Sequence, residues 1–342
     1  MTAIAPARCP SLPDDRSPVC VEVRETHIST VALRGKVKNA LDEARILILG
    51  AQVLLGFQYR AFFEPLYEKL DSGERMLELG ALFALLVTVA ALFLPPARHR
   101  IVEHGRDTAL FHRFTMMVMR VVLLPFAIGL SLDLAVAGNR IAGPWVGAAS
   151  GALTFAAAFA LWYGHFFRRD RQEEEDPEDA VEDTPLEQRI VEVLTEARIL
   201  LPGAQALLGF QLAMVLMEAF PRLPPEVQLV HLGSLGSIAL ATIVLIAPAA
   251  YHRIVERGRD TERFHSFASR MVLIALALLG PGFAGDLYVV LRRAGYDRAA
   301  LPAAIAAILI FYCGWFGAMA ILRLRAGSSA VRRSPPRQGA GR

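Results

Sequence analysis

The chain has 342 residues, with 36 basic and 33 acidic side chains and a formal net charge of +3. Hydrophobic residues make up 54% of it, which is more than a water-soluble protein with a polar surface carries and indicates a membrane protein. The small net charge argues against a nucleic-acid-binding surface, and three cysteines without a CxxC pair favour neither a disulfide framework nor a zinc site.

One stretch of the chain occurs twice. The segment HRIVEHGRDTALFH, residues 99–112, returns as HRIVERGRDTERFH at residues 252–265, with 11 of 14 positions identical and an offset of 153 residues. The same offset carries residues 43–58 onto residues 196–211 without a gap. The sequence therefore predicts two copies of one unit, each built around this charged turn.

The first unit is expected to span residues 39–168. It follows residues 1–38, which mix Pro, Asp, Arg and Ser and are expected to be a disordered cytoplasmic tail with a short helix near residues 31–41. The unit contains four apolar runs, each long enough to cross a membrane, which takes roughly 20 residues. We expect helices at about residues 44–63, 75–96, 114–137 and 141–167.

The second unit repeats this plan. Residues 169–190 carry a charge run and are expected to be a solvated cytoplasmic linker, because like charges repel. The unit spans residues 191–323, and a basic, disordered tail of residues 324–342 follows it. Helices are expected near residues 197–220, 226–248, 267–290 and 301–322. The predicted fold is all-α: a polytopic membrane protein with eight transmembrane helices in two parallel four-helix repeats.

Positive charge predicts the orientation. Arginine and lysine gather before the first helix of the first unit, between its second and third helices, and after its fourth. Because short cytoplasmic loops carry an excess of these residues, both termini are expected to be cytoplasmic in a bacterial inner membrane. No apolar stretch typical of a cleaved signal peptide occurs in residues 1–38. One outer loop of the predicted topology disagrees with this orientation, because it carries Arg292, Arg293 and Arg298.

The repeated turn is expected to be the tip of a helical hairpin. Gly105 would end one helix in the left-handed conformation, and Asp107 or Thr108 would cap the next. His99 and His112 would then lie at one height on neighbouring helices and could share a ligand, or they could simply anchor and hydrate the turn. Glu103 is expected to pair with His99, Arg100 or Arg106. The turn residues are His99, Glu103, Arg106, Asp107 and His112, with His252, Glu256, Arg259, Asp260 and His265 in the second copy.

Polar side chains interrupt the apolar helices at matching positions. Arg45, Gln52 and Gly56 share one face of the first expected helix, and the second copy repeats this face. A glutamine facing lipid is costly, so both faces should point into the bundle, as helix–helix contacts or as the lining of a polar pathway. The pathway candidates are Glu43, Arg45, Gln52, Gln58, Arg120, Asp133, Glu196, Arg198, Gln205, Gln211 and Asp286.

Two groups of these candidates lie near the expected membrane boundaries. Asp133 and Asp286 each end an apolar run near the outer end of a third helix, so they are either ion-binding or solvated. Glu43 and Arg45 are expected to form a salt bridge at the inner boundary. Arg120 lies deeper and would need a glutamine or an acid as its partner.

The residues LDEARILILGAQVLLGFQ (41–58) and PPARHRIVEHGRDTALFHR (95–113) resemble a family of small bacterial four-helix membrane proteins of unknown function. The resemblance covers residues 41–167 and 194–322, so it implies a fused duplication of a unit that is usually single. Some members are named sodium–proton antiporters. That name would implicate Glu43, Gln52, Gln58 and His99, with their counterparts, in ion exchange.

Two classes of function follow. One is a channel or transporter for protons or monovalent cations; the other is a non-catalytic scaffold or sensor whose exposed turns bind a cytoplasmic partner. Haem or metal ligation by the paired histidines is a third alternative. The sequence shows no nucleophile–base pair, phosphate-binding loop or metal constellation, so neither an enzyme nor a resident cofactor or metal is expected. Gly147 and Gly151 form a GxxxG motif that favours close helix packing, between the two units or between the protomers of a homo-oligomer.

Overall fold

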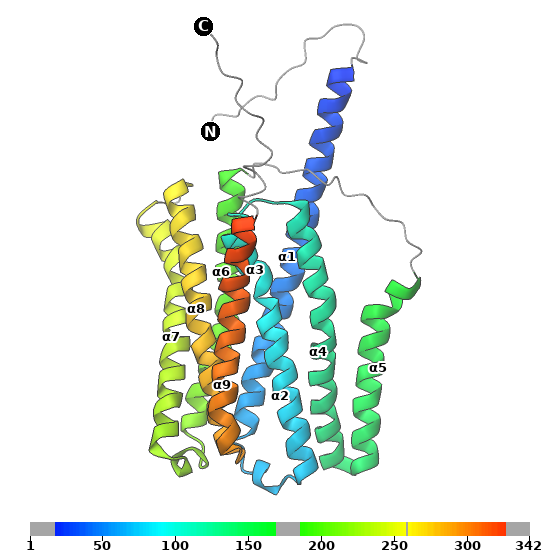
Figure 1. The fold of residues 1–342 in the computed structure, drawn as a ribbon, viewed down its shortest axis with the longest axis vertical. Coiled ribbons are helices and arrows are strands. Elements are labelled where there is room, and N and C mark those ends of the chain that lie inside the picture. The colour runs from blue at the N-terminus through cyan, green and yellow to red at the C-terminus, as the bar shows by residue number, and fades with distance from the viewer. Residues whose placement is uncertain (1–17, 169–184, 258, 326–342) are drawn as a thin grey trace.

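The structure is a computed structural model that describes residues 18–168, 185–257 and 259–325. These residues form an all-α bundle of long helices joined by short turns. Helices α1 and α6 both begin at the upper end of the bundle in Figure 1, so the chain enters its two halves from the same end. This matches the expected parallel arrangement of the repeats.

Each repeat supplies four long rods to the bundle. In the first repeat α2 and α3 form one rod, and in the second a π-helical turn, Cys313–Ala318, continues α9. The helices of the first repeat are α1 (Pro18–Ala61), α2 (Ser72–Leu92), α3 (Leu94–Ile101), α4 (Ala109–Ala142) and α5 (Pro144–Arg168). Those of the second are α6 (Leu186–Val215), α7 (Pro225–Ile254), α8 (Glu262–Arg293) and α9 (Asp297–Tyr312).

Helix α1 begins at Pro18, well before the helix expected near residue 44. Part of the expected tail is therefore helical, because no proline or glycine interrupts residues 19–34. The disorder expected for residues 1–17, for most of the linker (169–184) and for residues 326–342 falls outside the described residues.

Seven helical segments of the described chain are long and apolar enough to cross a membrane, which makes the protein a multi-pass membrane protein. Helix α1 is not among them, because Arg45, Gln52 and Gln58 interrupt its apolar run. All three side chains are buried, so neighbouring helices shield them. The segments are 72–101, 109–142, 144–163, 186–215, 225–254, 262–293 and 297–325.

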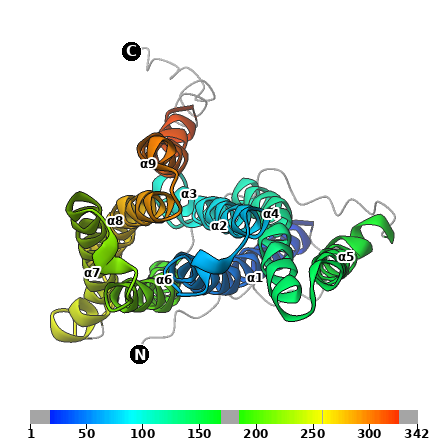
Figure 2. The same cartoon turned by 90° about the horizontal axis from the view of Figure 1, so that it is seen from below.

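The two repeats meet along α1 and α6, which lie side by side at the centre of the bundle (Figure 2). Close approach depends on glycine in both helices: the ring of Phe210 covers Gly56, and the side chain of Gln52 lies against Gly203. The rings of Phe57 and Phe210 are 4.3 Å apart, centroid to centroid. These contacts form the seam of the molecule.

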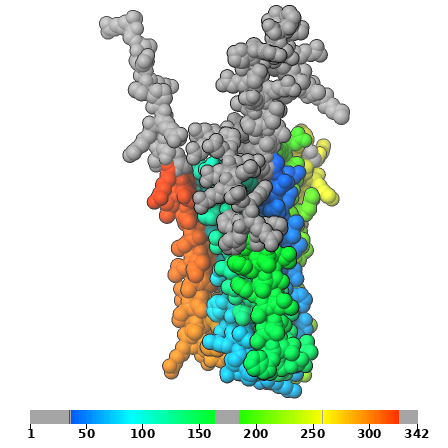
Figure 3. Space-filling model, turned by 90° about the vertical axis from the view of Figure 1, so that its right-hand side faces the viewer, coloured from blue at the N-terminus to red at the C-terminus, as the bar shows by residue number. Residues whose placement is uncertain are grey.

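The fourth helices of the two repeats are placed differently. Helix α5 packs on α4 and forms the outer edge seen in Figure 3. Helix α9 packs on α8 and also reaches the first repeat, where Trp315 Nε1 donates to the Ala90 carbonyl at 2.8 Å. Its counterpart Trp162 stacks on Phe126 of its own repeat. The duplication therefore does not give a symmetric assembly of the two halves.

Two of the three arginines on the expected outer loop, Arg292 and Arg293, are paired with acids. Arg293 donates to Glu68 at 2.7 Å, and this hydrogen bond lowers the pKa of the Glu68 carboxyl. Arg292 lies 3.3 Å from Glu226 and 2.9 Å from Asp297. Paired arginines add little net positive charge to this end of the bundle, so they do not oppose the orientation that the other loops indicate.

The GxxxG motif in α5 packs against α4 of the same repeat, and not between the two units as one of its expected roles required. A Cβ atom on Gly147 would lie 2.6 Å from the Ala135 carbonyl oxygen, and one on Gly151 would lie 2.9 Å from the Ala135 Cβ. Backbone atoms cannot move aside as a flexible side chain can, so only glycine fits at position 147.

Replacing Gly147 by alanine should therefore lower the free energy of unfolding by about 1–3 kcal/mol, because α5 must move away from α4. The matched control is Gly236→Ala in the middle of α7, where an added Cβ meets no atom within 4 Å. That change should be neutral or stabilising by up to about 1 kcal/mol through helix propensity. Unfolding midpoints of both variants in detergent test this, and equal midpoints would contradict it.

Candidate functional site

Three carboxylates of the first repeat line one cavity of about 320 Å³. One of them, Glu64, pairs with Arg60 of the same lining at 2.8 Å, which leaves Glu78 and Asp133 as the candidate ion-binding groups. Glu78 comes from α2, Asp133 from α4, and Gln58 of α1 joins them. The Gln58 Nε2 donates to Glu78 Oε2 at 2.7 Å and to the Glu78 carbonyl at 3.0 Å. Carboxylates inside an apolar bundle are costly unless they are paired with a donor, a proton or a cation.

The second repeat has a closed version of the same cluster. Gln211 Nε2 donates to both oxygens of Asp286 at 2.8 Å, and the Ser234 hydroxyl lies 2.7 Å from Oδ1. His231 Nδ1 is 3.9 Å from the same oxygen. All four side chains are buried. By the offset of 153, Asp286 matches Asp133 and His231 matches Glu78, so the two repeats share a position but differ in chemistry.

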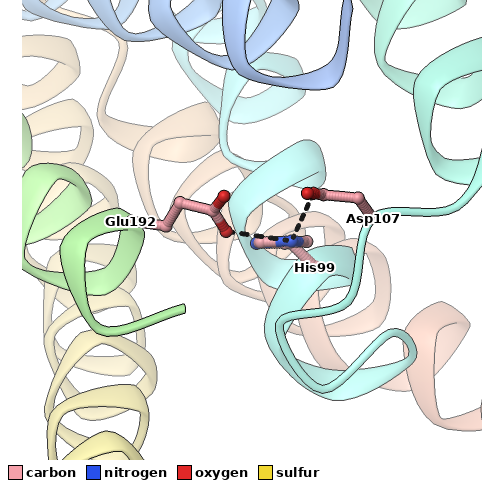
Figure 4. A group of neighbouring side chains, drawn as sticks. All are labelled: His99, Asp107 and Glu192. Carbon is pink, nitrogen blue, oxygen red and sulfur yellow. Dashed lines mark ion pairs between the residues drawn. The ribbon is translucent and has the colours of Figure 1, made fainter. Parts of the chain in front are cut away.

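A third cluster joins the two repeats at the end of the bundle where both begin (Figure 1). His99 of α3 lies between Asp107, in the turn after α3, and Glu192 of α6 (Figure 4). The His99 Nε2 is 3.9 Å from an oxygen of each carboxylate, and its Nδ1 is 3.5 Å from Glu196. His99 and Asp107 are 0% and 1% exposed.

A buried ion pair adjoins this cluster. Arg100 Nε donates to Glu196 Oε2 at 2.7 Å, and its Nη2 lies 2.6 Å from the same oxygen. Arg45 lies 3.9 Å from Glu196 and 2.6 Å from Asp42. The pair ties α3 of the first repeat to α6 of the second, and each charge is buried only because the other is present.

The turn after α3 holds Asp107 against His99. Gly105 has φ of +80°, and its N–H donates to the His99 carbonyl at 3.0 Å. Thr108 caps α4, since its Oγ1 accepts from the Phe111 N–H at 3.1 Å. The expected hairpin tip is confirmed. The ring of His99 stacks on Phe111 with centroids 4.7 Å apart, which fixes its orientation.

Several expected pathway residues meet, and others do not. Gln58 meets Asp133, Gln211 meets Asp286, and Arg45 meets Glu196. The expectation that Gln205 and Arg198 point inward is wrong: both are exposed, because α6 presents a different face to the bundle than α1 does. Asp286 is buried, not solvated. Glu43 and Arg120 are exposed, and Arg45 pairs with Asp42 and Glu196 in place of Glu43.

The repeated turns also differ from expectation. A scaffold that binds through exposed tips needs accessible His99 and Asp107, and both are buried. Glu103 pairs with Arg98 at 3.3 Å rather than with the residues expected. The histidines face carboxylates and an arginine: His252 lies 3.6 Å from Asp260, and His265 lies 3.0 Å from Arg189. Arg106 and Arg259 donate to the backbone carbonyls of Glu103 and Glu256.

Five contributors were missed from the sequence: Glu78, Arg100, Glu192, His231 and Ser234. Glu78 and His231 could have been found, because each is the polar residue at one shared position of an apolar helix. Glu192 lies one helical turn before Glu196, but no sequence pattern indicates that α3 packs beside it. That contact depends on how the repeats dock.

Comparison with known proteins identifies the family. Residues 30–165 and 180–319 each match a family of unknown function, DUF6328. The chain belongs to this family and carries its domain twice. No curated protein and no solved structure matches the chain. The family assignment supports the tandem duplication, while the DUF6328 description assigns no activity to any of the three clusters.

Replacing Arg100 by methionine should leave Glu196 as a buried charge and lower the free energy of unfolding by about 3–5 kcal/mol. The double variant Arg100→Met/Glu196→Met should recover most of this loss, because an apolar pair of similar size fills the same space. Denaturant unfolding of the two single variants and the double variant measures the coupling. Additive losses in the double variant would show that the pair does not act as a unit.

Proposed function

We propose that this DUF6328 protein transports protons or monovalent cations across the membrane. The supporting observation is the cavity shared by Glu78 and Asp133, with Gln58 between the helices that carry them. Oxygen ligands from two carboxylates and an amide suit a proton or a small cation such as Na⁺.

The position of the carboxylates supports a pathway. Glu78 lies six residues after the start of α2, and Asp286 lies seven before the end of α8. At a rise of about 1.5 Å per residue, these carboxylates sit roughly 10 Å inside the helix ends. Carboxylates at such depth provide a cation-binding site within the low-dielectric layer. Bare hydrocarbon provides no such site.

The two repeats would have different roles in ion transport. In the first repeat the carboxylates line an open cavity. In the second, Asp286 is buried and hydrogen-bonded to Gln211 and Ser234. The open cluster would exchange ions with water, and the closed one would bind a proton in a drier setting. His231 in place of Glu78 supplies a group that can accept and release a proton.

The proposed topology follows from the charges at the bundle ends. All eight long rods would cross the membrane, with the polar side chains Arg45, Gln52 and Gln58 of α1 covered by its neighbours. The end that carries His99, Arg100 and the repeated arginine-rich turns would face the cytoplasm of a bacterial cell, since short loops at that side carry the positive excess.

Proteoliposomes containing the purified protein should show a pH- or sodium-dependent flux. Glu78→Gln and Asp133→Asn should each lower it by about 10-fold or more, since they remove a carboxylate charge worth more than roughly 1.4 kcal/mol to a bound cation. The measurement is the fluorescence change of a pH-sensitive or sodium-sensitive dye enclosed in the vesicles.

The control is Glu187→Gln, which removes an exposed carboxylate at the start of α6, outside the cavity, and should leave the flux unchanged. Wild-type vesicles that carry folded protein and pass no ion would rule out transport. Flux that is insensitive to both Glu78→Gln and Asp133→Asn would rule out these residues as the ion-binding groups.

A further inference from the structure

The cluster around His99 has the composition of a metal site, and we propose that His99, Asp107 and Glu192 bind one first-row divalent metal ion such as Zn²⁺. The three residues come from α3, the following turn and α6, so the ion would bridge the two repeats. This site is separate from the ion-transport carboxylates proposed above.

The geometry fits a metal ion. One ligand atom from each residue can be chosen so that all three lie within 4.8 Å of one another, and His99 Nε2 is 3.9 Å from each carboxylate. Zn²⁺ binds nitrogen and oxygen at roughly 2.0–2.2 Å, so ligand atoms on adjacent corners of its shell lie about 3–4 Å apart. Imidazole with two carboxylates suits Zn²⁺ or Mn²⁺.

The side-chain amide of Gln188 orients the carboxylates of Asp107 and Glu192 toward the proposed metal position. Gln188 Nε2 donates to Asp107 Oδ2 at 3.3 Å and to Glu192 Oε1 at 3.1 Å. The other oxygen of each carboxylate, Oδ1 and Oε2, is the one that faces His99 Nε2. Outer hydrogen bonds of this kind orient metal ligands in known sites.

Burial supports the same conclusion. Both nitrogens of the fully buried His99 ring lack a hydrogen-bond partner among the described residues. A divalent ion would give Nε2 a ligand bond.

The second repeat cannot form the same site within one chain. By the offset, Asn39 replaces Glu192, and its side chain is exposed on α1. His252 and Asp260 are partly open to solvent, with side chains 21% and 38% exposed. The proposal therefore requires one metal ion per chain, not two.

The test is Zn²⁺ titration of chelator-treated protein by calorimetry, with metal content by mass spectrometry. Wild type should bind one ion, and His99→Phe, which keeps the stacking on Phe111, should lose it. His252→Phe is the matched control and should still bind one. Gln188→Leu should bind about 10–100-fold more weakly, as expected when an orienting hydrogen bond is lost.

Absence of binding by folded wild-type protein would overturn the proposal. Equal affinity in wild type, His99→Phe and Gln188→Leu would also overturn it, since the ion would then be elsewhere. If His99→Phe does not fold, comparison of the Zn²⁺ affinity of Gln188→Leu with that of His252→Phe still tests the proposal.

A different observation carries a second inference, about assembly. Helices α1 and α6 are copies of each other, yet they meet through different faces. In the seam Arg45 lies 3.9 Å from Glu196, Gln52 lies against Gly203, and Phe210 covers Gly56. Helix α1 therefore contributes Arg45, Gln52 and Gly56 to the seam, and α6 contributes Glu196, Gly203 and Phe210.

The unused copy of each face is exposed. On α6, Arg198, Gln205 and Gly209 match the α1 side of the seam, and all three are exposed. On α1, Glu43 and Phe57 match Glu196 and Phe210. Glu43 is exposed, and Phe57, whose ring packs on Phe210 in the seam, is still 51% exposed. A Cβ atom on Gly50, the match of Gly203, or on Gly209 would meet no atom within 4 Å.

We propose that a second copy of the chain docks on these faces and repeats the seam between chains. Arg198 would pair with Glu43 of the second copy, Gln205 would lie against its Gly50, and its Phe57 would cover Gly209. Such a contact joins unlike surfaces head to tail, and it closes into a ring when the rotation between neighbours divides a full turn.

The end of α7 supports the same docking. Arg100 of α3 is buried and paired to Glu196 of α6, and the following Ile101 is half-buried. Their matches Arg253 and Ile254 are exposed, and Ile254 is 76% exposed. Docking a second copy in the seam geometry would bring its Glu43 to Arg253 and cover this apolar surface.

Cysteine cross-linking tests the register. Chains with their three native cysteines changed to serine, carrying either Gly50→Cys or Gln205→Cys and different tags, are mixed in one membrane and oxidised. A hetero-dimer linked between residues 50 and 205 should form. The control, Gly50→Cys with Leu309→Cys on the exposed side of α9, should give only background.

Charge reversal gives a second measurement. Arg198→Glu on the Gln205→Cys chain should lower the cross-linked yield about 2–5-fold, and adding Glu43→Arg to the other chain should restore it. Cross-linking no better than the control, or a monomer by native mass spectrometry of folded protein, would overturn the proposal.

Discussion

The buried pair of Arg100 and Glu196 is the contact on which the arrangement of the two repeats depends. A charge in the interior of a bundle is tolerated only when an opposite charge and good hydrogen bonds meet it there. Arg100 belongs to the first repeat and Glu196 to the second, so neither repeat can bury its own charge alone. This need for partners orients α3 against α6 and brings Asp107 and His99 to Glu192.

The two repeats carry copies of each helix and differ in charge at a few shared positions. Glu78 and His231 occupy one such position, and Glu192 and Asn39 occupy another. Each difference changes the charge of a site while the helix that carries it is present in both repeats. The first repeat therefore has carboxylates that line an open cavity, the matching cluster of the second has the single buried carboxylate of Asp286, and the contact between the repeats has a histidine between two acids.

The seam also explains why equivalent residues have unequal surroundings. When two identical units meet through like faces, matching residues are equally buried; when they meet through unlike faces, one copy of each face is left over. Gln52 is fully buried and Gln205 is exposed for this reason. Polar side chains on a membrane-facing helix are costly, so the exposed Arg198 and Gln205 favour a further protein contact over contact with lipid.

The sequence by itself determined the all-α membrane character, the tandem repeat and the hairpin tip, because these depend on local composition, periodicity and glycine and cap residues. It also marked Gln58, Asp133, Gln211 and Asp286 as polar candidates, but it did not pair each glutamine with its aspartate. Only the tertiary structure decided which acids meet His99 and which glutamine is buried. Those outcomes depend on the faces through which α1 and α6 pack, and two copies of one sequence pattern do not specify that choice.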